Sequence, residues 1–382
     1  MVVLYDVGAK DEDEKHTGFA HLFEHLMFGG SRNIPNFDEA LQLAGGSNNA
    51  YTTNDLTCYY CTLPAANIET AFWLESDRML SLAFTPKSLE VQRSVVIEEF
   101  KEHYLNAPYG DLYHLIHALN YKVHPYRWPT IGKNLEQIEC ATMEDVRAFF
   151  AAHYYPANAI LVLSGGITTQ QVHALCNKWF APIPSLQRTQ RSLPIEPPRT
   201  EYLRETVERN VPTSLLYISF QMPGRRSKDY IIYDMLTDIL SLGRGGRLNA
   251  ELVRKQGLFT SIDASVDGTI ETGLVSISGM VREGVTLEQA EQGVWNELQR
   301  LSRISEDELK RIQNLYETDA LYQEMRSSRR AELLAEYELY GDANAVNRRV
   351  QERAEVTTKM LEIYATNTFT RENCRSLHYR AK

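Results

Sequence analysis

The sequence predicts an α+β fold of two related domains, each a mixed, largely antiparallel sheet covered by helices. Four segments are apolar or alternate between apolar and polar residues, and helical patterns separate them: residues 56–63, 160–164, 215–221 and 274–280. Such a mixture of strands and helices is typical of layered α+β folds. With 382 residues the chain is long enough for two domains with cores of their own.

A duplication in the sequence supports the two-domain plan. Several segments of the first half have counterparts of the same kind and order in the second: 142–150 and 160–164 match 356–364 and 374–379, and 56–80 matches 272–298. We therefore expect a first domain at 1–183, whose N-terminal strand looks truncated, and a second at 201–382. A proline-rich, polar linker joins them at 184–200. Helical patterns at 326–340 and 343–366 are expected on the surface of the second domain.

The composition excludes several classes of protein. The chain has 43% hydrophobic and 24% charged residues, as ordinary soluble proteins do, and its net charge of −10 argues against nucleic-acid binding. No apolar run approaches the roughly 20 residues that span a bilayer. The start of the chain lacks a signal-peptide pattern, so we expect a cytoplasmic location, with a periplasmic one as the alternative should a segment precede Met1.

The chain has five cysteines, an odd number and too few for a disulfide framework. Cys58 and Cys61 form a CxxC pair, but they fall on an expected strand, where residues three apart point to opposite faces. We do not expect this pair to bind metal. Cys140, Cys176 and Cys374 are expected to be small core residues.

The stretch His21-Leu22-Phe23-Glu24-His25 is the strongest functional signal in the chain. On a helix His21 and His25 are four residues apart and share one face, close enough to bind one metal ion. Glu24 then lies beside the metal without binding it, in the position of a general base. Both histidines and the carboxylate lie in an otherwise apolar helix, where unpartnered polar groups are costly, and metal coordination satisfies all three. The spacing is that of the inverted zincin motif.

A catalytic zinc ion needs a third protein ligand and one open position. The segment 88–104 predicts a helix capped by Thr85 or Ser88, and it offers Glu98 and Glu99. Glu99 shares a face with Gln92 and with valines, whereas Glu98 falls on the side of the polar residues. We therefore choose Glu99, and we expect one Zn²⁺ per chain.

Four blocks of the sequence resemble, in order, those of the pitrilysin-type zinc peptidases, the family of insulin-degrading enzyme and mitochondrial processing peptidase. They are GFAHLFEHLMFGGSRN, GGSNNAYTTNDLTCYYCTLP, QRSVVIEEF and HPYRWPTIG. The resemblance implies a two-domain subunit of the short bacterial type, with a LuxS- and processing-peptidase-like fold. It implies His21, His25 and Glu99 as zinc ligands, Glu24 as the base, and hydrolysis of peptides or unfolded polypeptides.

The second half carries no copy of the metal motif. Asp234 to Leu240 stands where the first half has its motif helix, and residues 305–325 correspond to the helix that carries Glu99. One half is thus expected to bind metal and the other not.

The strand that follows the motif helix is a candidate substrate site. Its two opening glycines, Gly45 and Gly46, allow close approach, and an exposed edge here can pair with an extended peptide. The resemblance assigns this substrate-binding edge to Asn49 and Ala50. Asp55, just beyond, is a candidate for orienting a ligand histidine.

The chain departs from the family pattern at three positions. Single-chain members carry an arginine and, seven residues later, a tyrosine, where this sequence has Val253 and Thr260. Neither residue can stabilise an oxyanion as Arg and Tyr do. We therefore expect a heterodimer with a homologous subunit that lacks the zinc motif but supplies this pair, with a homodimer as an alternative. Gln92 replaces a glutamate of many members, a change expected to alter zinc affinity or polarisation of the bound water.

Two other functions remain open at this point. The family includes noncatalytic structural or assembly subunits, against which the intact motif at His21, Glu24, His25 and Glu99 argues. A peptide-binding module without turnover is suggested by the missing arginine and tyrosine.

Overall fold

A computed structural model describes residues 1–184, 186–188 and 191–382. The described chain packs into two compact units, the first formed by Met1–His117, Val123–Ile195 and Gln323–Val346, the second by Ala118–Lys122, Glu196–Tyr322 and Asn347–Lys382. The expected linker at 184–200 includes residues 185, 189 and 190, which lie outside the described residues. The domain limits at 183 and 201 stay predictions.

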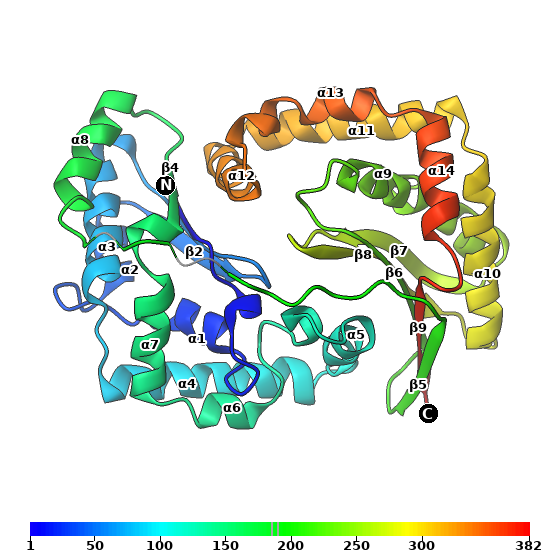
Figure 1. Ribbon diagram of the computed structural model, residues 1–382, viewed down its shortest axis with the longest axis horizontal. Coiled ribbons are helices and arrows are strands. Elements are labelled where there is room, and N and C mark those ends of the chain that lie inside the picture. Colours follow the sequence, from blue (N-terminus) through cyan, green and yellow to red (C-terminus); the bar gives the residue numbers. More distant parts are fainter. Residues whose placement is uncertain (185, 189–190) are drawn as a thin grey trace. The chain divides into compact units, whose positions relative to one another are not determined.

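The first unit holds a four-stranded antiparallel sheet of order β2-β3-β1-β4 (Figure 1). Its elements are β1 (Val2–Tyr5), η1 (Ala9–Asp11), α1 (Phe19–Leu26), α2 (Phe37–Leu43), β2 (Ser47–Thr52), β3 (Thr57–Thr62), η2 (Ala65–Asn67), α3 (Ile68–Ser81), α4 (Pro86–Phe100), the π-turn η3 (Lys101–Leu105), most of α5 (Leu112–Asn120), η4 (Pro125–Arg127), α6 (Leu135–Glu139), α7 (Met143–His153), η5 (Pro156–Asn158), β4 (Ala159–Val162), α8 (Thr169–Trp179), α12 (Ser327–Tyr340) and most of η8 (Ala343–Asn347).

One face of this sheet packs on helices α1 and α3. Val3, Tyr5 and Tyr59 lie on that face, and they share a buried cluster with Phe23 of α1 and Phe72 of α3. Since strand residues alternate between faces, the residues between them point to the other side of the sheet.

Helix α12 packs against β1, β3 and β4, although it comes from the last quarter of the chain. Its buried residues include Ala331, Ala335 and Leu339. The expectation that 326–340 belongs to the second domain is therefore wrong. The local pattern predicts a helix with one buried side, but it does not say which sheet covers that side.

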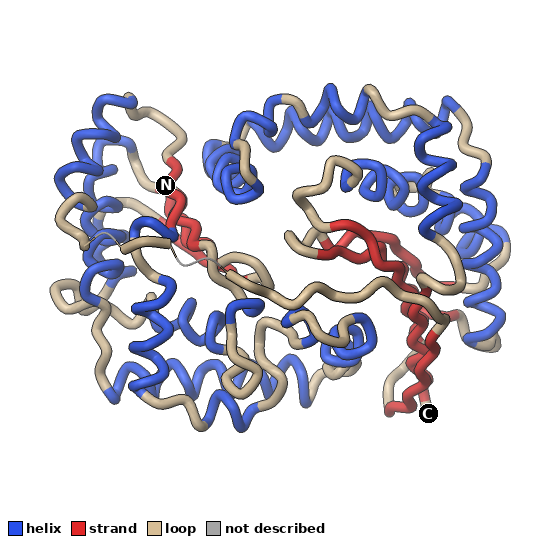
Figure 2. The backbone as a smooth tube through the Cα atoms, in the orientation of Figure 1, coloured by secondary structure: helices blue, strands red, loops and turns tan. Residues whose placement is uncertain are grey.

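The second unit holds a five-stranded sheet of order β5-β9-β6-β8-β7, in which only the β5–β9 pair is parallel. Figure 2 draws the strands in red and the helices in blue. Its elements are β5 (Leu203–Arg209), β6 (Leu215–Pro223), α9 (Tyr230–Ser241), the π-turn η6 (Asn249–Lys255), β7 (Phe259–Asp267), β8 (Thr272–Val281), α10 (Leu287–Gln299), η7 (Arg300–Ser302), most of α11 (Glu306–Glu324), α13 (Arg349–Ala354), α14 (Thr358–Thr368) and β9 (Cys374–Ala381).

Alternate residues of β6 build the core of this unit. Leu216, Ile218 and Phe220 are at most 1% exposed and pack with residues of α9, α10 and α14. The two sheets and their helical covers confirm the predicted α+β class. The four predicted strands appear as β3, β4, β6 and β8, each within two residues of the expected limits.

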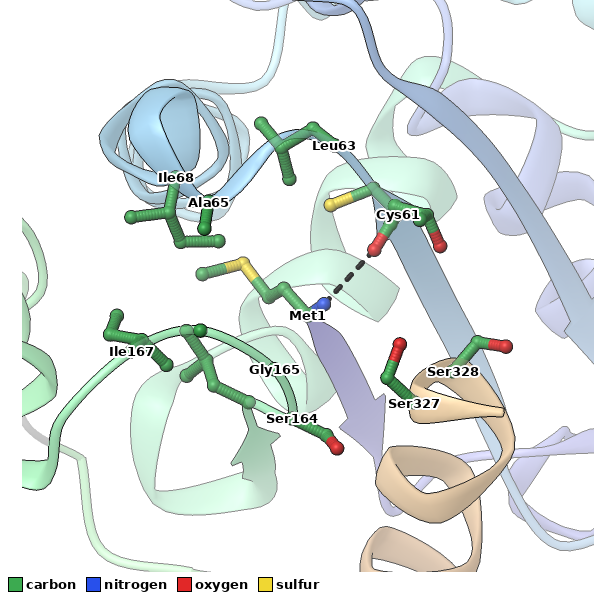
Figure 3. A pocket seen from close by; sticks show the side chains of 13 residues that line it. Met1, Cys61, Leu63, Ala65, Ile68, Ser164, Gly165, Ile167, Ser327 and Ser328 are labelled. Carbon is green, nitrogen blue, oxygen red and sulfur yellow. Dashed lines mark hydrogen bonds between the residues drawn. The ribbon is translucent and has the colours of Figure 1, made fainter. Parts of the chain in front are cut away.

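A pocket of about 220 Å³ lies beside Met1 in the first unit (Figure 3). Its lining includes Cys61 and Leu63 of β3 and its downstream turn, the Gly165-Gly166 turn, and Ser327 and Ser328 at the start of α12. The amino group of Met1 donates a hydrogen bond to the Cys61 carbonyl at 3.0 Å. None of the predicted site residues lines this pocket.

Two expectations from the composition concern the cysteines and membrane-spanning helices. All five cysteines are free, but Cys140 is exposed at the C-terminal end of α6, so its assignment to the core is wrong. Over the described ranges, no helix combines the length and hydropathy needed to span a membrane.

Candidate metal centre

The motif helix α1 begins at Phe19, directly after a glycine with unusual geometry. Gly18 has φ 88°, and a Cβ there would lie 2.7 Å from the carbonyl oxygen of Ile131, so a side chain is excluded. Leu22 and Phe23 are fully buried against the core. This burial leaves the motif residues on the partly exposed side of the helix.

Helix α4 presents the third candidate ligand. Thr85 is its N-cap, and Ser88 completes a capping box with it, so both expected cap residues take part. Glu99 lies near the end of α4, which packs on α1 (Figure 1). Glu98 instead binds Lys101 at 2.8 Å and is 72% exposed. The structure thus brings Glu99, and not Glu98, to the histidines.

The three side chains converge on one point. Oε2 of Glu99 lies 3.4 Å from Nε2 of His25 and 3.7 Å from Nε2 of His21, and the three ligand atoms all lie within 4.8 Å of one another. A tetrahedral zinc ion with bonds of about 2.0–2.1 Å separates its ligand atoms by about 3.4 Å. The residues therefore fit a zinc ion. They form the one such cluster found in the part of the chain that the structure describes.

The environment sets the protonation of these groups. Burial lowers the pKa of His21 to about 4, which favours the neutral imidazole that metals bind. A hydrogen bond from His25 and the nearby His21 hold the pKa of Glu99 below its usual value, although burial acts to raise it. Two imidazoles and a carboxylate are the donor set of a catalytic zinc site.

Glu24 has a partner that the sequence did not predict. The hydroxyl of Thr52, at the end of β2, donates to Oε2 of Glu24 at 2.6 Å. Burial raises the pKa of Glu24, and the Thr52 bond and the nearby His25 lower it. A carboxylate with a raised pKa accepts a proton more readily, and its hydrogen bond fixes its orientation. The only sequence signal for Thr52 is its place at the end of the substrate strand.

The predicted substrate strand is an edge strand. β2 pairs with β3 on one side and is last in its sheet, so Asn49 and Ala50 lie at an edge. The side-chain oxygen of Asn49 accepts a hydrogen bond from the Ala50 N–H at 2.9 Å. The free edge is therefore partly capped by one of its own side chains, as exposed edge strands often are.

Asp55 does not take the place expected for it. Its Oδ1 accepts from the Lys10 ammonium at 2.7 Å and from the Tyr126 hydroxyl at 2.5 Å. Nδ1 of His21 has no hydrogen-bond partner among the described residues, so Asp55 does not orient that ring in this structure. The reason is that Lys10, only 2% exposed, requires a buried counter-charge. Gln92 lies on α4, two turns before Glu99, and is partly buried.

The residues at the family's arginine and tyrosine positions lie in the second unit. Val253 belongs to η6 and packs against the core of that unit. Thr260 is exposed on β7, and its hydroxyl donates to the Met280 carbonyl at 3.3 Å. Neither places a cationic or phenolic donor at these positions.

A helix that carries His-x-x-Glu-His, a distant glutamate and a second related domain without the motif define the inverted-motif class of zinc peptidases. Comparison with known proteins agrees with this class. Residues 1–133 match the family model described as insulinase (peptidase family M16), and residues 141–316 match the model described as peptidase M16 inactive domain. The chain belongs to the peptidase M16 family, which includes pitrilysin and the mitochondrial processing peptidase.

Individual relatives cover different shares of the chain. The Helicobacter pylori protein named zinc protease PqqE is 30% identical over 268 residues, which are 67% of this chain and 59% of the relative. The β subunit of the Caenorhabditis elegans mitochondrial-processing peptidase is 27% identical over 180 residues, or 47% of this chain and 39% of that protein. The crystal structure of a Helicobacter pylori protease matches with a TM-score of 0.94 at 26% identity and covers 99% of this chain and 92% of that one.

Proposed function

We propose that this chain is a zinc-dependent metalloendopeptidase subunit that hydrolyses peptides or unfolded polypeptides. The observation that carries the proposal is the convergence of His21, His25 and Glu99, with Glu24 beside them. Relatives named as zinc proteases support the same reading.

The roles of the residues follow from their positions. His21, His25 and Glu99 would hold the ion. Zinc bound there would polarise the scissile carbonyl and lower the pKa of a water toward about 7. Glu24 would accept a proton from the attacking water and pass it to the leaving amine, while Thr52 holds the carboxylate in place.

The substrate would bind as an added strand on β2. An extended peptide would pair with the edge at Asn49 and Ala50, a few residues from Thr52 and hence next to the base. The Asn49 side chain must first leave the Ala50 N–H. Strand pairing of this kind recognises main-chain groups, so it suits unfolded segments of varied sequence.

A partner subunit is the second part of the proposal. Val253 and Thr260 cannot supply the donors that stabilise an oxyanion beyond the metal. A homologous subunit that lacks the zinc motif would supply the arginine and tyrosine. The same two residues favour the alternative of a peptide-binding subunit without turnover, and noncatalytic members of the family suggest the other alternative, an assembly subunit.

Zinc analysis tests the metal site and separates the first function from an assembly role. The purified protein should contain about one zinc per chain, and Glu99→Ala should lose most of it. Lys101, which binds Glu98, offers a control because Lys101→Ala leaves the cluster untouched. A wild-type protein that takes up no zinc at micromolar concentrations would refute the metal site.

Cleavage of an unstructured fluorogenic peptide tests turnover. The peptide should be hydrolysed by the chain together with the subunit that co-purifies from the native source. Glu24→Gln should retain zinc and abolish cleavage. Full activity of the chain alone would refute the need for a partner, and zinc-loaded protein that binds peptide without cleaving it, with or without a partner, would favour the peptide-binding alternative.

A further inference from the structure

Helix α1 lacks a side-chain cap of its own. Its N-cap is Gly18, so no side chain at that position can accept the free N–H groups of the first turn. His21 lies in this first turn, whereas His25 lies near the other end of the helix. Fraying of the first turn would therefore displace one candidate ligand and leave the other in place.

A carboxyl group from outside the helix takes the missing role. Oε2 of Glu12 accepts from the Gly18 N–H at 3.0 Å, and its Oε1 accepts from the Ala20 N–H at 2.8 Å. The indole N–H of Trp128 donates to Oε2 at 3.1 Å. Glu12 is 7% exposed and Trp128 is 3% exposed.

The segment that carries Glu12 is itself tied to the end of the substrate strand. The N–H of Lys10 donates to the Asn54 carbonyl at 2.9 Å, and the Lys10 ammonium binds Asp55 at 2.7 Å. Asn54 and Asp55 belong to the turn between β2 and β3. The buried contacts thus run from this turn, through residues 10–12, to the first turn of α1.

We propose that Glu12 is a positioning residue of the metal centre, which acts by holding His21 at the N-terminus of α1. This inference rests on the proposed zinc site. Glu12 acts through the helix, because its oxygens bind the backbone N–H groups of the turn that carries His21.

Burial raises the pKa of Glu12 to about 8, against the opposing effect of its N–H donors. The cap depends on the geometry of the two carboxyl oxygens, each of which accepts a hydrogen bond from a backbone N–H. Glu12→Gln replaces one of these oxygens by an NH₂ group, which faces a backbone or indole N–H and cannot accept from it.

A matched control exists in the second unit. Glu291 is 2% exposed and accepts hydrogen bonds from Tyr202 at 2.7 Å and from the indole of Trp295 at 3.2 Å. It also pairs with His378 at 2.8 Å. Burial acts to raise its pKa, but these partners lower the pKa to about 2. Glu291→Gln therefore perturbs an equally buried glutamate whose hydrogen bonds come from side chains of the second unit and not from α1.

The test measures zinc affinity by competition with a chelator, and the absorption spectrum of the cobalt-substituted protein. Loss of a cap costs a factor of about 2 to 30 in helix stability, so Glu12→Gln should weaken zinc binding about tenfold and change the cobalt spectrum. Glu291→Gln should change neither. Because the effect passes through His21, Glu12→Gln should weaken binding no further in a His21→Ala background.

Each outcome decides the inference. Wild-type zinc affinity and cobalt spectrum in folded Glu12→Gln would overturn it, as would an equal loss in the His21→Ala background or in Glu291→Gln. If Glu12→Gln does not fold, Glu12→Asp, which keeps both oxygens but is shorter, replaces it under the same criteria. A wild-type protein without zinc affinity would overturn the proposed site and this inference together, whereas zinc-binding wild type with unaffected Glu12→Gln would overturn the inference alone.

Discussion

The hydrogen bond between Thr52 and Glu24 allows a quantitative test of the base. Thr52→Val keeps the shape of the side chain and removes the donor that lies 2.6 Å from Oε2 of Glu24. Leaving a half-buried carboxylate without this partner costs about 1–3 kcal/mol. If Glu24 must hold its orientation in the transition state, that cost corresponds to a fall in kcat of about 5- to 150-fold.

The sign of the pH effect follows from the same contact. The Thr52 bond lowers the pKa of Glu24, so its loss should raise that pKa further. When the solution is acidified, the activity of Thr52→Val should therefore begin to fall at a higher pH than the activity of the wild-type protein, because both require the ionised base. KM should change little, because Thr52 contacts the base and not the peptide.

The assay is hydrolysis of an unstructured fluorogenic peptide between pH 5 and 9, in the preparation that is active with wild-type chain, with zinc content measured in parallel. Thr62→Val, at an exposed position of the neighbouring strand β3, is the matched control. Wild-type kcat and an unmoved acid limb in zinc-loaded Thr52→Val would show that Glu24 does not act as an oriented base.

Three further predictions concern stability and binding. Arg78→Met should lower the free energy of unfolding by about 3–5 kcal/mol in urea titrations, because its ion-pair partner Glu75, which is 1% exposed, is left without a counter-charge. Lys178→Met is the control: its ion pair with Glu69 has a similar length, but the lysine is 60% exposed, so the loss should be less than about 1 kcal/mol. The low pKa of Glu291 means that its ionised form stabilises the fold above pH 4.5 and loses that effect as the pH falls toward 2. The stability difference between wild type and Glu291→Gln should therefore shrink over that range, and a difference independent of pH would contradict the lowered pKa. Asn49→Ala should lower KM about two- to tenfold by freeing an edge N–H, and an unchanged or higher KM would argue against pairing at this edge.

The ligand set could be predicted because it depends on local geometry. The spacing of His21 and His25 fixes their common face once a helix is assumed, and the same periodicity separates Glu99 from Glu98. Thr52 could not be found this way. Its contact with Glu24 depends on where β2 lies against α1, which no spacing within one element reveals.

Buried charged residues account for the main differences between the site predicted from the sequence and the site in the structure. Lys10, Glu12 and Asp55 belong to residue types that are mostly exposed, so nothing in their local sequence predicts a buried network. Asp55 was expected beside a histidine because it follows the substrate strand, but it binds the buried ammonium group of Lys10 instead. Partners that come from distant segments decide such sites, as they decide the sheet on which α12 packs.

The second unit shows how the duplicated helix is held without a metal. In α9, Asp234 and Asp238 are four residues apart, the same spacing as His21 and His25 in α1. The guanidinium of Arg353, on α13, binds Asp238 at 2.6 Å and also binds Asp234. Arg353 is 3% exposed.

This arginine also connects α9 to the counterpart of the Glu99 helix. Its guanidinium carbon lies 3.7 Å from the ring centre of Tyr316, on α11. In both units, then, paired side chains four residues apart on one helix would face a cation that links them to a second helix. In the second unit that cation is a covalently tethered guanidinium, which needs no ligand from solution and has no open coordination position for water or a carbonyl. We therefore expect hydrolytic chemistry in the first unit alone, with the second unit retained for its packing and for the surfaces it offers to substrate or partner.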